Sequence, residues 1–413
     1  MTVPAQESET PIVPVGAAAI SANVDAHLAA ESVAEGILDQ LEAGVRPDLL
    51  VAFVSGEHAT QAAVVSQVLR RHLEPRHLFG ATAVSVLAGG EDIENSAGVS
   101  ALALKLPGAR FTPFRYRDLP QGDSEDPKVI QRAATQLELG EDLRGVLFVG
   151  DPFSVPANRT VDVFSQLGGY ERPRVPVIGG MASAGRGAGQ NLLMLDDDLL
   201  NAGGIGMAIS GEVTVDTLVS QGCRPIGRPM VITQCSKNIV RQLGGRPALE
   251  LLQETIDELG AEDRALLEKG LFVGVVIDEY KERFGRGDFL IRSVLGIEKD
   301  SRALAFGDLV RAGQTVQFHV RDATTASEDL ELLLDSQRIR DEAIGTLLFS
   351  CNGRGSAFFG EANHDARVTN SALGGQPLAG FHAAGEIGPI GDRSFVHGHS
   401  ASMAIFRKWR FRV

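Results

Sequence analysis

The sequence is poor in cysteine and has no excess of positive charge. Its three cysteines, Cys223, Cys235 and Cys351, are too few and too widely spaced for a disulfide framework or a cysteine-based zinc site. Lys and Arg number 39 against 53 Asp and Glu, which gives a net charge of −14. Because non-specific binding to phosphates needs clustered Lys and Arg, we expect neither nucleic acid nor an anionic membrane as a partner.

Long hydrophobic runs and targeting segments are also missing. No apolar stretch approaches the about 18 residues that a membrane-spanning helix needs. The first basic residue is Arg46, so the N-terminus lacks the positive start of a signal peptide. We therefore expect a soluble cytoplasmic protein. With 413 residues, 44% of them hydrophobic, the chain can bury a large core and form roughly two or three structural units.

The pattern along the chain changes after the first twenty residues. Residues 1–20 are Pro, Ala, Val and small polar residues without a period, which predicts a disordered leader. Residues 21–47 have apolar positions at helical spacing, which predicts an N-terminal helix. The same spacing predicts helices over Pro247–Leu259 and Ala326–Ile344, each followed closely by a glycine.

An internal repeat is the most informative feature. Short apolar runs typical of buried strands occur at Leu49–Val54, Val146–Val149, Leu271–Ile277 and Thr346–Phe349. The first, second and fourth lead, about thirty residues later, into a run marked by glycine and then into another apolar strand. These glycine-marked runs are Phe79–Ser85, Gly180–Gly185 and Gly380–Gly385. Because order and spacing agree across three units, duplication is favoured over chance similarity.

The order of strands and helices in these units predicts an α/β fold of the mixed α+β kind, in which helices cover sheets of parallel and antiparallel strands. We expect two internally duplicated halves, 48–215 and 216–413, each containing a mixed sheet with helices packed on it, and an αββα layering is one arrangement that fits. The Gly180 and Gly380 segments should then lie in equivalent elements.

Catalytic and nucleotide-binding motifs are not evident. The loops Gly185–Gly189 and Cys351–Gly355 are rich in glycine, but Gly-Lys-Ser/Thr follows neither loop, and neither opens the helix of a dinucleotide-binding unit. Tight turns explain both loops. We therefore assign no catalytic residue, no metal and no cofactor.

Two interpretations as an enzyme remain open as alternatives. His382, His397 and His399 lie close in sequence, and a His-x-His pair on a strand places both rings on one face, as metal sites do. Cys351 follows a buried strand, where a nearby base could activate its thiol. Packed rings and a small buried thiol are the simpler interpretations of these residues.

Polar residues without an obvious structural role gather in the last unit. They flank glycines where strands pass into loops, which is where mixed α/β folds place ligand sites. An arginine can bind a carboxylate through two hydrogen bonds and a glutamate can accept an ammonium group, a combination that suits a zwitterionic amino acid. Side chains that only fix the loops are the alternative. The residues are Cys351, Asn352, Arg354, Gly385, Glu386, Arg393 and His397.

Two regions of the sequence resemble the FIST family. The first runs from Gly222 to Thr233 and continues over Gln242–Glu250. The second combines Phe349–Arg354 with Gly380–Pro389 and His397–Ser402. Weaker similarity of the same kind extends the resemblance back to about Asp48.

The resemblance implies a two-part sensory domain, with a FIST N-like part at 48–215 and a FIST C-like part at 216–413. Members of this family are thought to bind small ligands, with amino acids as the suggested class, and to pass the signal to a partner protein. No catalytic mechanism attaches to the family, and a scaffold that binds only proteins is a further alternative. Since no signalling module is recognised here, the partner is expected to be a separate protein. The polar positions that match are Arg224, Cys351, Asn352, Arg354, Glu386 and His397.

Overall fold

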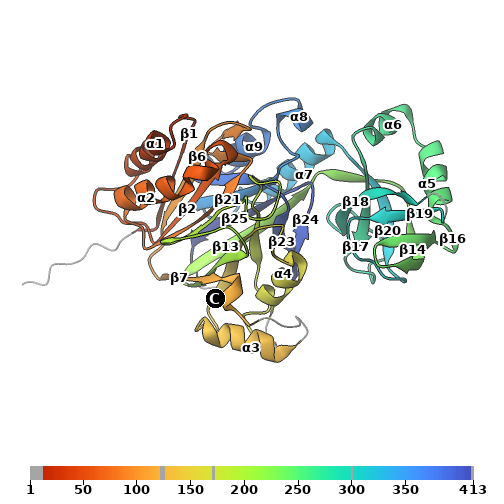
Figure 1. The fold of residues 1–413 in the computed structure, drawn as a ribbon, viewed down its shortest axis with the longest axis horizontal. Coiled ribbons are helices and arrows are strands. Elements are labelled where there is room, and N and C mark those ends of the chain that lie inside the picture. Colours follow the sequence, from red (N-terminus) through yellow and green to blue (C-terminus); the bar gives the residue numbers. More distant parts are fainter. Residues whose placement is uncertain (1–12, 121–125, 170–172, 299–300, 411–413) are drawn as a thin grey trace, which may run out of the picture.

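The computed structural model describes residues 13–120, 126–169, 173–298 and 301–410 (Figure 1). Within these ranges the chain forms a body of three six-stranded sheets and a separate barrel. The three sheets are built from three units of the same plan. Each unit has a first strand, a helix, a second strand parallel to the first, a hairpin, and a last strand antiparallel to the first.

The first unit lies near the N-terminus. Its strands are β2 (Leu49–Ser55), β3 (His77–Ala83), the hairpin β4–β5 (Ser85–Ala88 and Glu91–Glu94) and β6 (Val99–Lys105), with η1 (Gly56–Gln61) and α2 (Ala62–Leu73) between β2 and β3. An edge strand, β1 (Val15–Ser21), pairs with β6, and α1 (Ala26–Leu38) joins β1 to β2.

The second and third units repeat this order. The second contains β7 (Ala109–Arg115), η2 (Tyr116–Asp118), α3 (Pro127–Gln136), β8 (Leu143–Gly150), α4 (Ala157–Ser165), β9 (Val177–Met181), the hairpin β10–β11 (Leu193–Leu195 and Asp198–Leu200) and β12 (Gly204–Gly211). The third contains β13 (Val213–Gln221), α7 (Ala323–Asp335), β21 (Ala343–Cys351), α8 (Ser356–Phe359), α9 (His364–Ala372), β22 (Leu378–Ala383), the hairpin β23–β24 (Glu386–Ile390 and Arg393–His397) and β25 (Ser400–Lys408).

Each unit gives its hairpin to the sheet of another unit. The hairpin β10–β11 extends β3, β23–β24 extends β9, and β4–β5 extends β22. The sheets therefore run β1-β6-β2-β3-β10-β11, β7-β12-β8-β9-β23-β24 and β13-β25-β21-β22-β4-β5. Two of the three sheets therefore combine strands from both halves of the chain, so the halves 48–215 and 216–413 share sheets.

One glycine recurs at the same place in all three units. Gly80, Gly179 and Gly380 lie in the second strand of their unit, and at each a Cβ would overlap the carbonyl oxygen of the residue paired with it in the first strand. Only glycine allows this close backbone approach. The predicted equivalence of the Gly180 and Gly380 segments is confirmed, with an offset of one residue along β9.

The three sheets enclose a common core and carry helices on their outer faces. Phe53, Phe349 and Phe381 meet in this core, with the ring centroids of Phe53 and Phe381 4.8 Å apart. Helices α1 and α2 cover the first sheet, α3 and α4 the second, and α7 and α9 the third. The predicted mixed α+β class, with mixed sheets covered by helices, is confirmed.

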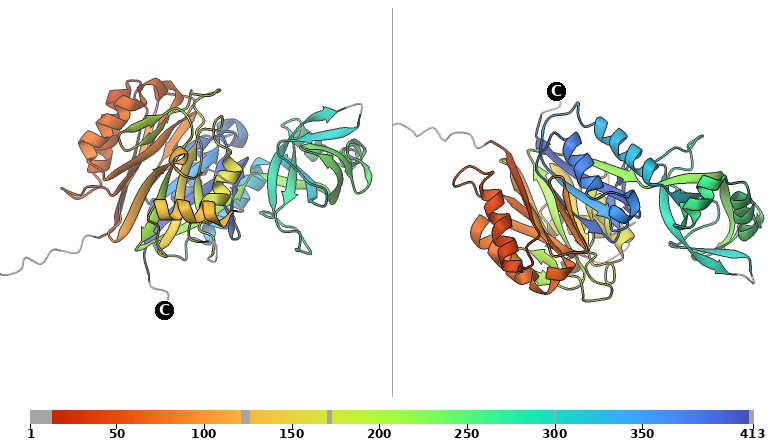
Figure 2. Two further views of the ribbon diagram at one scale, coloured as in Figure 1. Left: turned by 60° about the horizontal axis from the view of Figure 1, so that its bottom comes forward. Right: turned by 90° about the horizontal axis from the view of Figure 1, so that it is seen from above.

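The barrel is inserted between β13 and α7. Its sheet runs β14-β20-β17-β18-β19-β15-β16 and closes through pairing of β14 with β15. Figures 1 and 2 show it at one side of the body, which the chain leaves at Gly222 and re-enters at Asp322. The elements are β14 (Cys223–Ser236), β15 (Ile239–Leu243), β16 (Arg246–Pro247), α5 (Ala248–Asp257), α6 (Ala261–Leu267), β17 (Leu271–Val276), β18 (Phe289–Glu298), β19 (Ala303–Phe306) and β20 (Thr315–Arg321).

Two expected elements differ from the structure. The predicted disorder of residues 1–20 is wrong from Val15 onward, because Val15–Ser21 forms β1 along Val99–Lys105, while residues 1–12 lie outside the described part of the chain. The helix expected to reach Ile344 ends at Asp335, since Ala343 already begins β21. Among the helices of the described ranges, none is long and apolar enough to cross a membrane.

Candidate functional site

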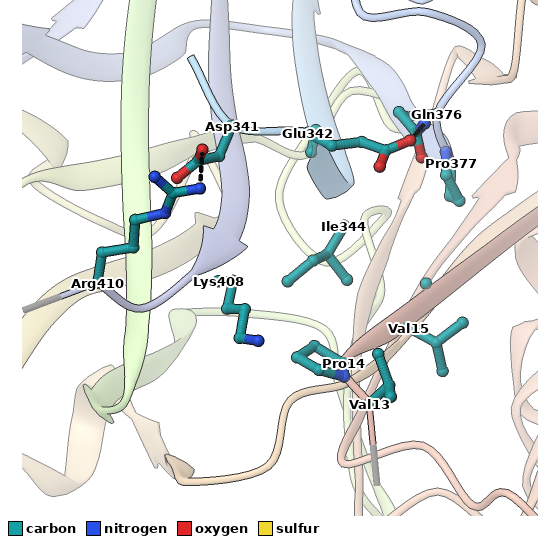
Figure 3. A pocket seen from close by; sticks show the side chains of 12 residues that line it. Val13, Pro14, Val15, Asp341, Glu342, Ile344, Gln376, Pro377, Lys408 and Arg410 are labelled. Carbon is teal, nitrogen blue, oxygen red and sulfur yellow. Dashed lines mark hydrogen bonds and ion pairs between the residues drawn. The ribbon is translucent and has the colours of Figure 1, made fainter.

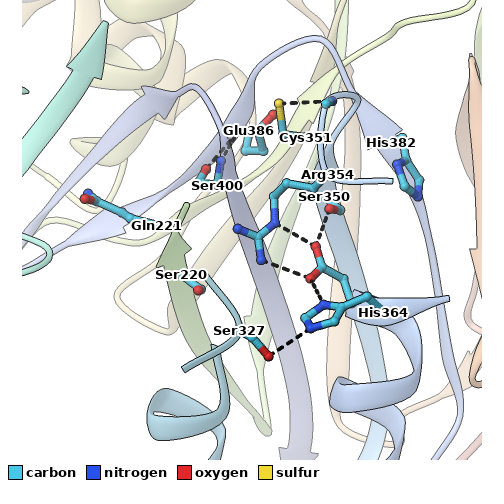
Figure 4. Close-up of polar contacts among 12 residues, drawn as sticks. Ser220, Gln221, Ser327, Ser350, Cys351, Arg354, His364, His382, Glu386 and Ser400 are labelled. Atoms are coloured by element: carbon cyan, nitrogen blue, oxygen red, sulfur yellow. Dashed lines mark hydrogen bonds and ion pairs between the residues drawn. The ribbon is translucent and has the colours of Figure 1, made fainter. Parts of the chain in front are cut away.

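A buried polar cluster lies where the third unit meets the barrel (Figure 4). The body supplies residues from the end of β21, the start of β23 and the turn before β25, and the barrel supplies the last residue of β20. We call this group the junction cluster. It consists of Cys351, Arg354, Asp365, Glu386, Ser400, His399 and Arg321.

Arg354 is 1% exposed and forms a bidentate ion pair with Asp365, with Nε–Oδ2 and Nη2–Oδ1 distances of 2.7 and 2.9 Å. Ser350 donates to the same carboxylate at 2.6 Å, and Nδ1 of His364 lies 3.0 Å from it. Burial alone would raise the pKa of Asp365, but Arg354, His364 and Ser350 hold it well below its usual range. Nη1 of Arg354 has no hydrogen-bond partner among the described residues.

Glu386 is completely buried at the first position of β23. Its Oε2 accepts hydrogen bonds from the backbone N–H and the hydroxyl of Ser400, at 3.0 and 2.8 Å. Within the part of the chain that the structure describes, Oε1 has no partner. Burial raises the pKa of Glu386 to about 7, although Ser400, Arg354 and Cys351 each act to lower it. The carboxyl group therefore exchanges its proton near neutral pH.

The thiol of Cys351 is buried at the end of β21 and accepts a hydrogen bond from the backbone N–H of Gly353 at 3.5 Å. Burial, and then the charge of Glu386, raise the pKa of Cys351 to about 12. The thiol is thus protonated at neutral pH, which is the state of a packed cysteine and not of an activated nucleophile.

Arg321 and His399 also belong to the cluster, although the sequence did not single out Arg321 and pointed to His399 only as part of the metal alternative. Arg321 donates from Nη2 to the carbonyl oxygen of Gly353 at 2.5 Å, and its guanidinium carbon lies 4.3 Å from the ring centroid of Phe358. The ring of His399 packs against Phe272 of the barrel, with centroids 4.4 Å apart. Burial, followed by the charges of Arg321 and Arg354, lowers the pKa of His399 to about 4. No local sequence pattern indicates that Arg321 lies against the third unit.

Three other predicted residues lie beside the cluster. The side chain of Asn352 is exposed, but its Oδ1 accepts a hydrogen bond from the thiol of Cys351 at 3.8 Å, and Gly385 takes a φ of 145° just before Glu386. His397 donates Nε2–H to the carbonyl oxygen of Gly388 at 2.9 Å, and burial lowers its pKa to about 4. Its ring is therefore neutral and holds the β23–β24 hairpin.

The two remaining predicted residues are paired elsewhere. Arg224 binds Asp322 at 3.0 Å and also pairs with Asp263 of α6. Arg393 is half exposed and lies 3.6 Å from Asp162 of α4, on the second unit. The structure therefore brings Cys351, Arg354 and Glu386 together, and gives Arg224 and Arg393 carboxylate partners away from the cluster.

The histidines of the metal alternative are not assembled into one site. Nε2 of His382 lies 3.6 Å from the carboxylate of Asp92, whereas His397 bonds to a backbone carbonyl and His399 packs on Phe272. In the described ranges, no three His, Cys, Asp or Glu side chains are placed so that they could hold a metal ion. These rings do not fit the metal alternative.

A cavity of about 380 Å³ lies at the opposite end of β21, away from the junction cluster (Figure 3). Lys408, Arg410, Asp341 and Glu342 supply its charged groups, and Arg410 pairs with Asp341 at 2.6 Å on the exposed rim. Its charged groups are paired or face solvent, in contrast to the buried charges of the junction cluster.

The chain is similar to two family models, to proteins of mycobacteria and to solved structures. The family models of the FIST N domain and the FIST C domain match residues 48–246 and 248–389. An uncharacterized protein of Mycobacterium tuberculosis (strain CDC 1551 / Oshkosh) is 36% identical over 389 residues, covering 94% of this chain and 98% of its own. An uncharacterized protein of Mycobacterium bovis is 37% identical over 398 residues, covering 92% and 96%.

Among solved structures, the chain is similar to a cyanuric acid hydrolase from A. caulinodans, with 9% identity, coverage of 96% and 100%, and a TM-score of 0.34. A second cyanuric acid hydrolase gives 11% identity and a TM-score of 0.32. These values are too low to support any statement about activity. The two family models together cover most of the sequence, and the chain belongs to the FIST family.

Proposed function

We propose that this chain is a sensory domain that binds a small ligand at the junction cluster, and that the ligand carries both a carboxylate and an ammonium group, as an amino acid does. Membership of the FIST family supports a role in small-ligand sensing. The observation that carries the proposal is that Nη1 of Arg354 and Oε1 of Glu386, on two buried ionisable side chains, have no hydrogen-bond partner of suitable geometry among the described residues. The group beside the Glu386 carboxylate that lowers its pKa, apart from Ser400 and Arg354, is the weakly donating thiol of Cys351.

Leaving such atoms unpaired is energetically unfavourable. A buried polar group without a partner costs about 1–3 kcal/mol, and more when it is charged. A fold under no other constraint would be expected to pair these atoms internally, as it pairs Oε2 of Glu386 with Ser400. A carboxylate on Nη1 of Arg354 and an ammonium on Oε1 of Glu386 would satisfy both atoms at once.

The output of the sensor is proposed to pass to a separate signalling protein. The chain passes between body and barrel at Gly222 and Asp322, beside the cluster, and His399 of the body packs on Phe272 of the barrel there, so a ligand bound at the cluster would act on both parts of the molecule.

Native mass spectrometry of protein purified without added ligand tests the proposal. We expect a small molecule that is released on denaturation, and Glu386→Gln should reduce its retention because the ammonium group loses its carboxylate. Asp329→Asn is the matched control, since Asp329 is also buried and also accepts from a serine hydroxyl and a backbone N–H, but outside the cluster. Equal loss in both variants, or no loss in either, would show that Glu386 is a structural brace.

A further inference from the structure

Arg321 is the cation of the junction cluster without a carboxylate partner. It ends β20, where it pairs with Cys223 at the end of the barrel nearest the body. No carboxylate of the described residues forms an ion pair with it, and its Nε is buried without a hydrogen-bond partner in the same ranges. Its contacts are the carbonyl oxygen of Gly353 and the ring of Phe358.

Arg321 therefore keeps capacity to bind an anion. Arg354 is paired with Asp365, whereas among the described residues no carboxylate pairs directly with Arg321, and Glu386 is uncharged below its pKa of about 7. A partly buried guanidinium without a counter-ion is costly and favours binding of an anion. The planar guanidinium is well suited to a carboxylate, which accepts two parallel hydrogen bonds.

Arg321 and Arg354 reach the same group of residues from different parts of the molecule. Both guanidinium groups act on the thiols of Cys223 and Cys351 and on the ring of His399. The chain crossing between them is tight, because a Cβ at Gly222 would lie 2.9 Å from Nη1 of Arg354 and 2.6 Å from the carbonyl oxygen of His399.

We propose that Arg321 is an anion-binding residue of this site, and that the carboxylate of the ligand bridges Arg321 of the barrel and Arg354 of the body. This rests on the proposed ligand-binding function. A carboxylate shared by the two arginines ties the barrel to the body, so that occupancy sets how firmly the barrel is held. Because the chain passes between barrel and body at Gly222 and Asp322, beside these two arginines, ligand binding would change directly how the barrel is held.

Binding measured by calorimetry and by thermal shift tests the bridge. The probes are the twenty L-amino acids, acetate as a carboxylate alone, and methylammonium as a cation alone. We expect at least one amino acid and, more weakly, acetate to bind the wild type, and Arg321→Gln to weaken both by about tenfold or more, a factor that corresponds to the loss of one charged hydrogen bond. Methylammonium should not respond to Arg321→Gln.

Arg292→Gln is the matched control. Arg292 is a barrel arginine of comparable burial, but it is already paired with Asp308 at 2.7 Å, so its loss should leave probe affinity unchanged. If amino acids bind and Arg321→Gln has no effect, the bridge is wrong and the proposed function stands. If acetate binds through Arg321 but no amino acid binds, the anion site stands and the amino-acid ligand is wrong. If neither binds the wild type, both proposals are overturned.

Discussion

The three units of the body end their first strand in different ways, although their backbones are the same. The equivalent residues are Ser55, which is the last of β2, Asp151, which directly follows β8, and Cys351, which is the last of β21. Ser55 accepts a hydrogen bond from the backbone N–H of Gly98 at 2.8 Å, and Asp151 accepts from Asn191 and Ser154 at 2.9 and 2.5 Å. The first two strand ends are thus closed by bonds within their own unit or its neighbour.

The third strand end is different because buried charges beside it are left unpaired. Arg354 and Glu386 each retain an atom without a partner among the described residues, and the barrel sits against this end. A repeated core provides the same scaffold three times, and the third strand end differs from the other two in having unpaired atoms of Arg354 and Glu386 beside it, which is where we propose the ligand site.

Removing Arg354 should have the largest effect. Arg354→Met leaves the carboxylate of Asp365 buried without its counter-ion, and we expect a loss of about 3–5 kcal/mol in the free energy of unfolding, measured by urea denaturation. The double variant Arg354→Met with Asp365→Leu should recover most of that loss. A change below about 1 kcal/mol in the single variant would mean that the ion pair is not held as the structure has it.

The equivalence of the three units can be tested at their shared glycine. Gly80→Ala, Gly179→Ala and Gly380→Ala each force a Cβ into the paired carbonyl oxygen, and each should lower the free energy of unfolding by about 3 kcal/mol. Gly296→Ala is the control, because a Cβ there meets nothing within 4 Å. A neutral result at any one of the three positions would break the threefold equivalence.

The pH dependence of stability should separate Glu386 from the carboxylates of the other units. Its pKa in the folded protein, about 7, lies above the ordinary value of 4.5, so the folded state keeps a proton that the unfolded state has lost. The stabilisation is full below about pH 4.5 and falls by about 3 kcal/mol as the pH rises to 7.

Glu386→Gln removes this dependence, since glutamine does not titrate. The difference in unfolding free energy between wild type and Glu386→Gln should therefore change over pH 4.5–7 and be constant above it. A difference that does not vary with pH in this window would show that Glu386 is already ionised when folded.

The smallest effect is expected at Arg224, which the family resemblance places among the site residues. Its guanidinium is part exposed and already bound by Asp322 and Asp263, so Arg224→Gln should cost about 1 kcal/mol in stability and leave the retained small molecule in place. Loss of that molecule in Arg224→Gln, without loss of stability, would return Arg224 to the site.

The repeat and the class of fold could be predicted from local patterns. Short apolar runs such as Val146–Val149 and glycine-marked runs such as Gly380–Gly385 report the strands and their order, because burial and close backbone approach constrain those residues directly. The number of repeated units was harder to predict, because a buried strand has the same apolar pattern in any sheet. Leu271–Ile277 has this pattern but belongs to the barrel and not to a repeated unit.

Features that depend on distant partners could not be predicted. A hairpin such as β4–β5 has the same local pattern whichever sheet it joins, so the exchange between units is not visible in the sequence. The same applies to the site. Arg354, Glu386 and Arg393 were all selected because they lie near glycines. Arg354 and Glu386 meet in the cluster, but Arg393 pairs with Asp162, which is far away in the chain. Which charges remain unpaired is a property of the tertiary structure.

Binding of amino acids to the wild type and to Glu386→Gln at pH 8 is the most direct measurement. At this pH the carboxyl of Glu386 is ionised and can accept an ammonium group. We expect at least one of the twenty L-amino acids to bind the wild type and to bind Glu386→Gln about tenfold or more weakly, with Asp329→Asn unchanged. Equal affinity in all three proteins, or no binding to the wild type, would contradict a ligand site at the junction of the third unit and the barrel.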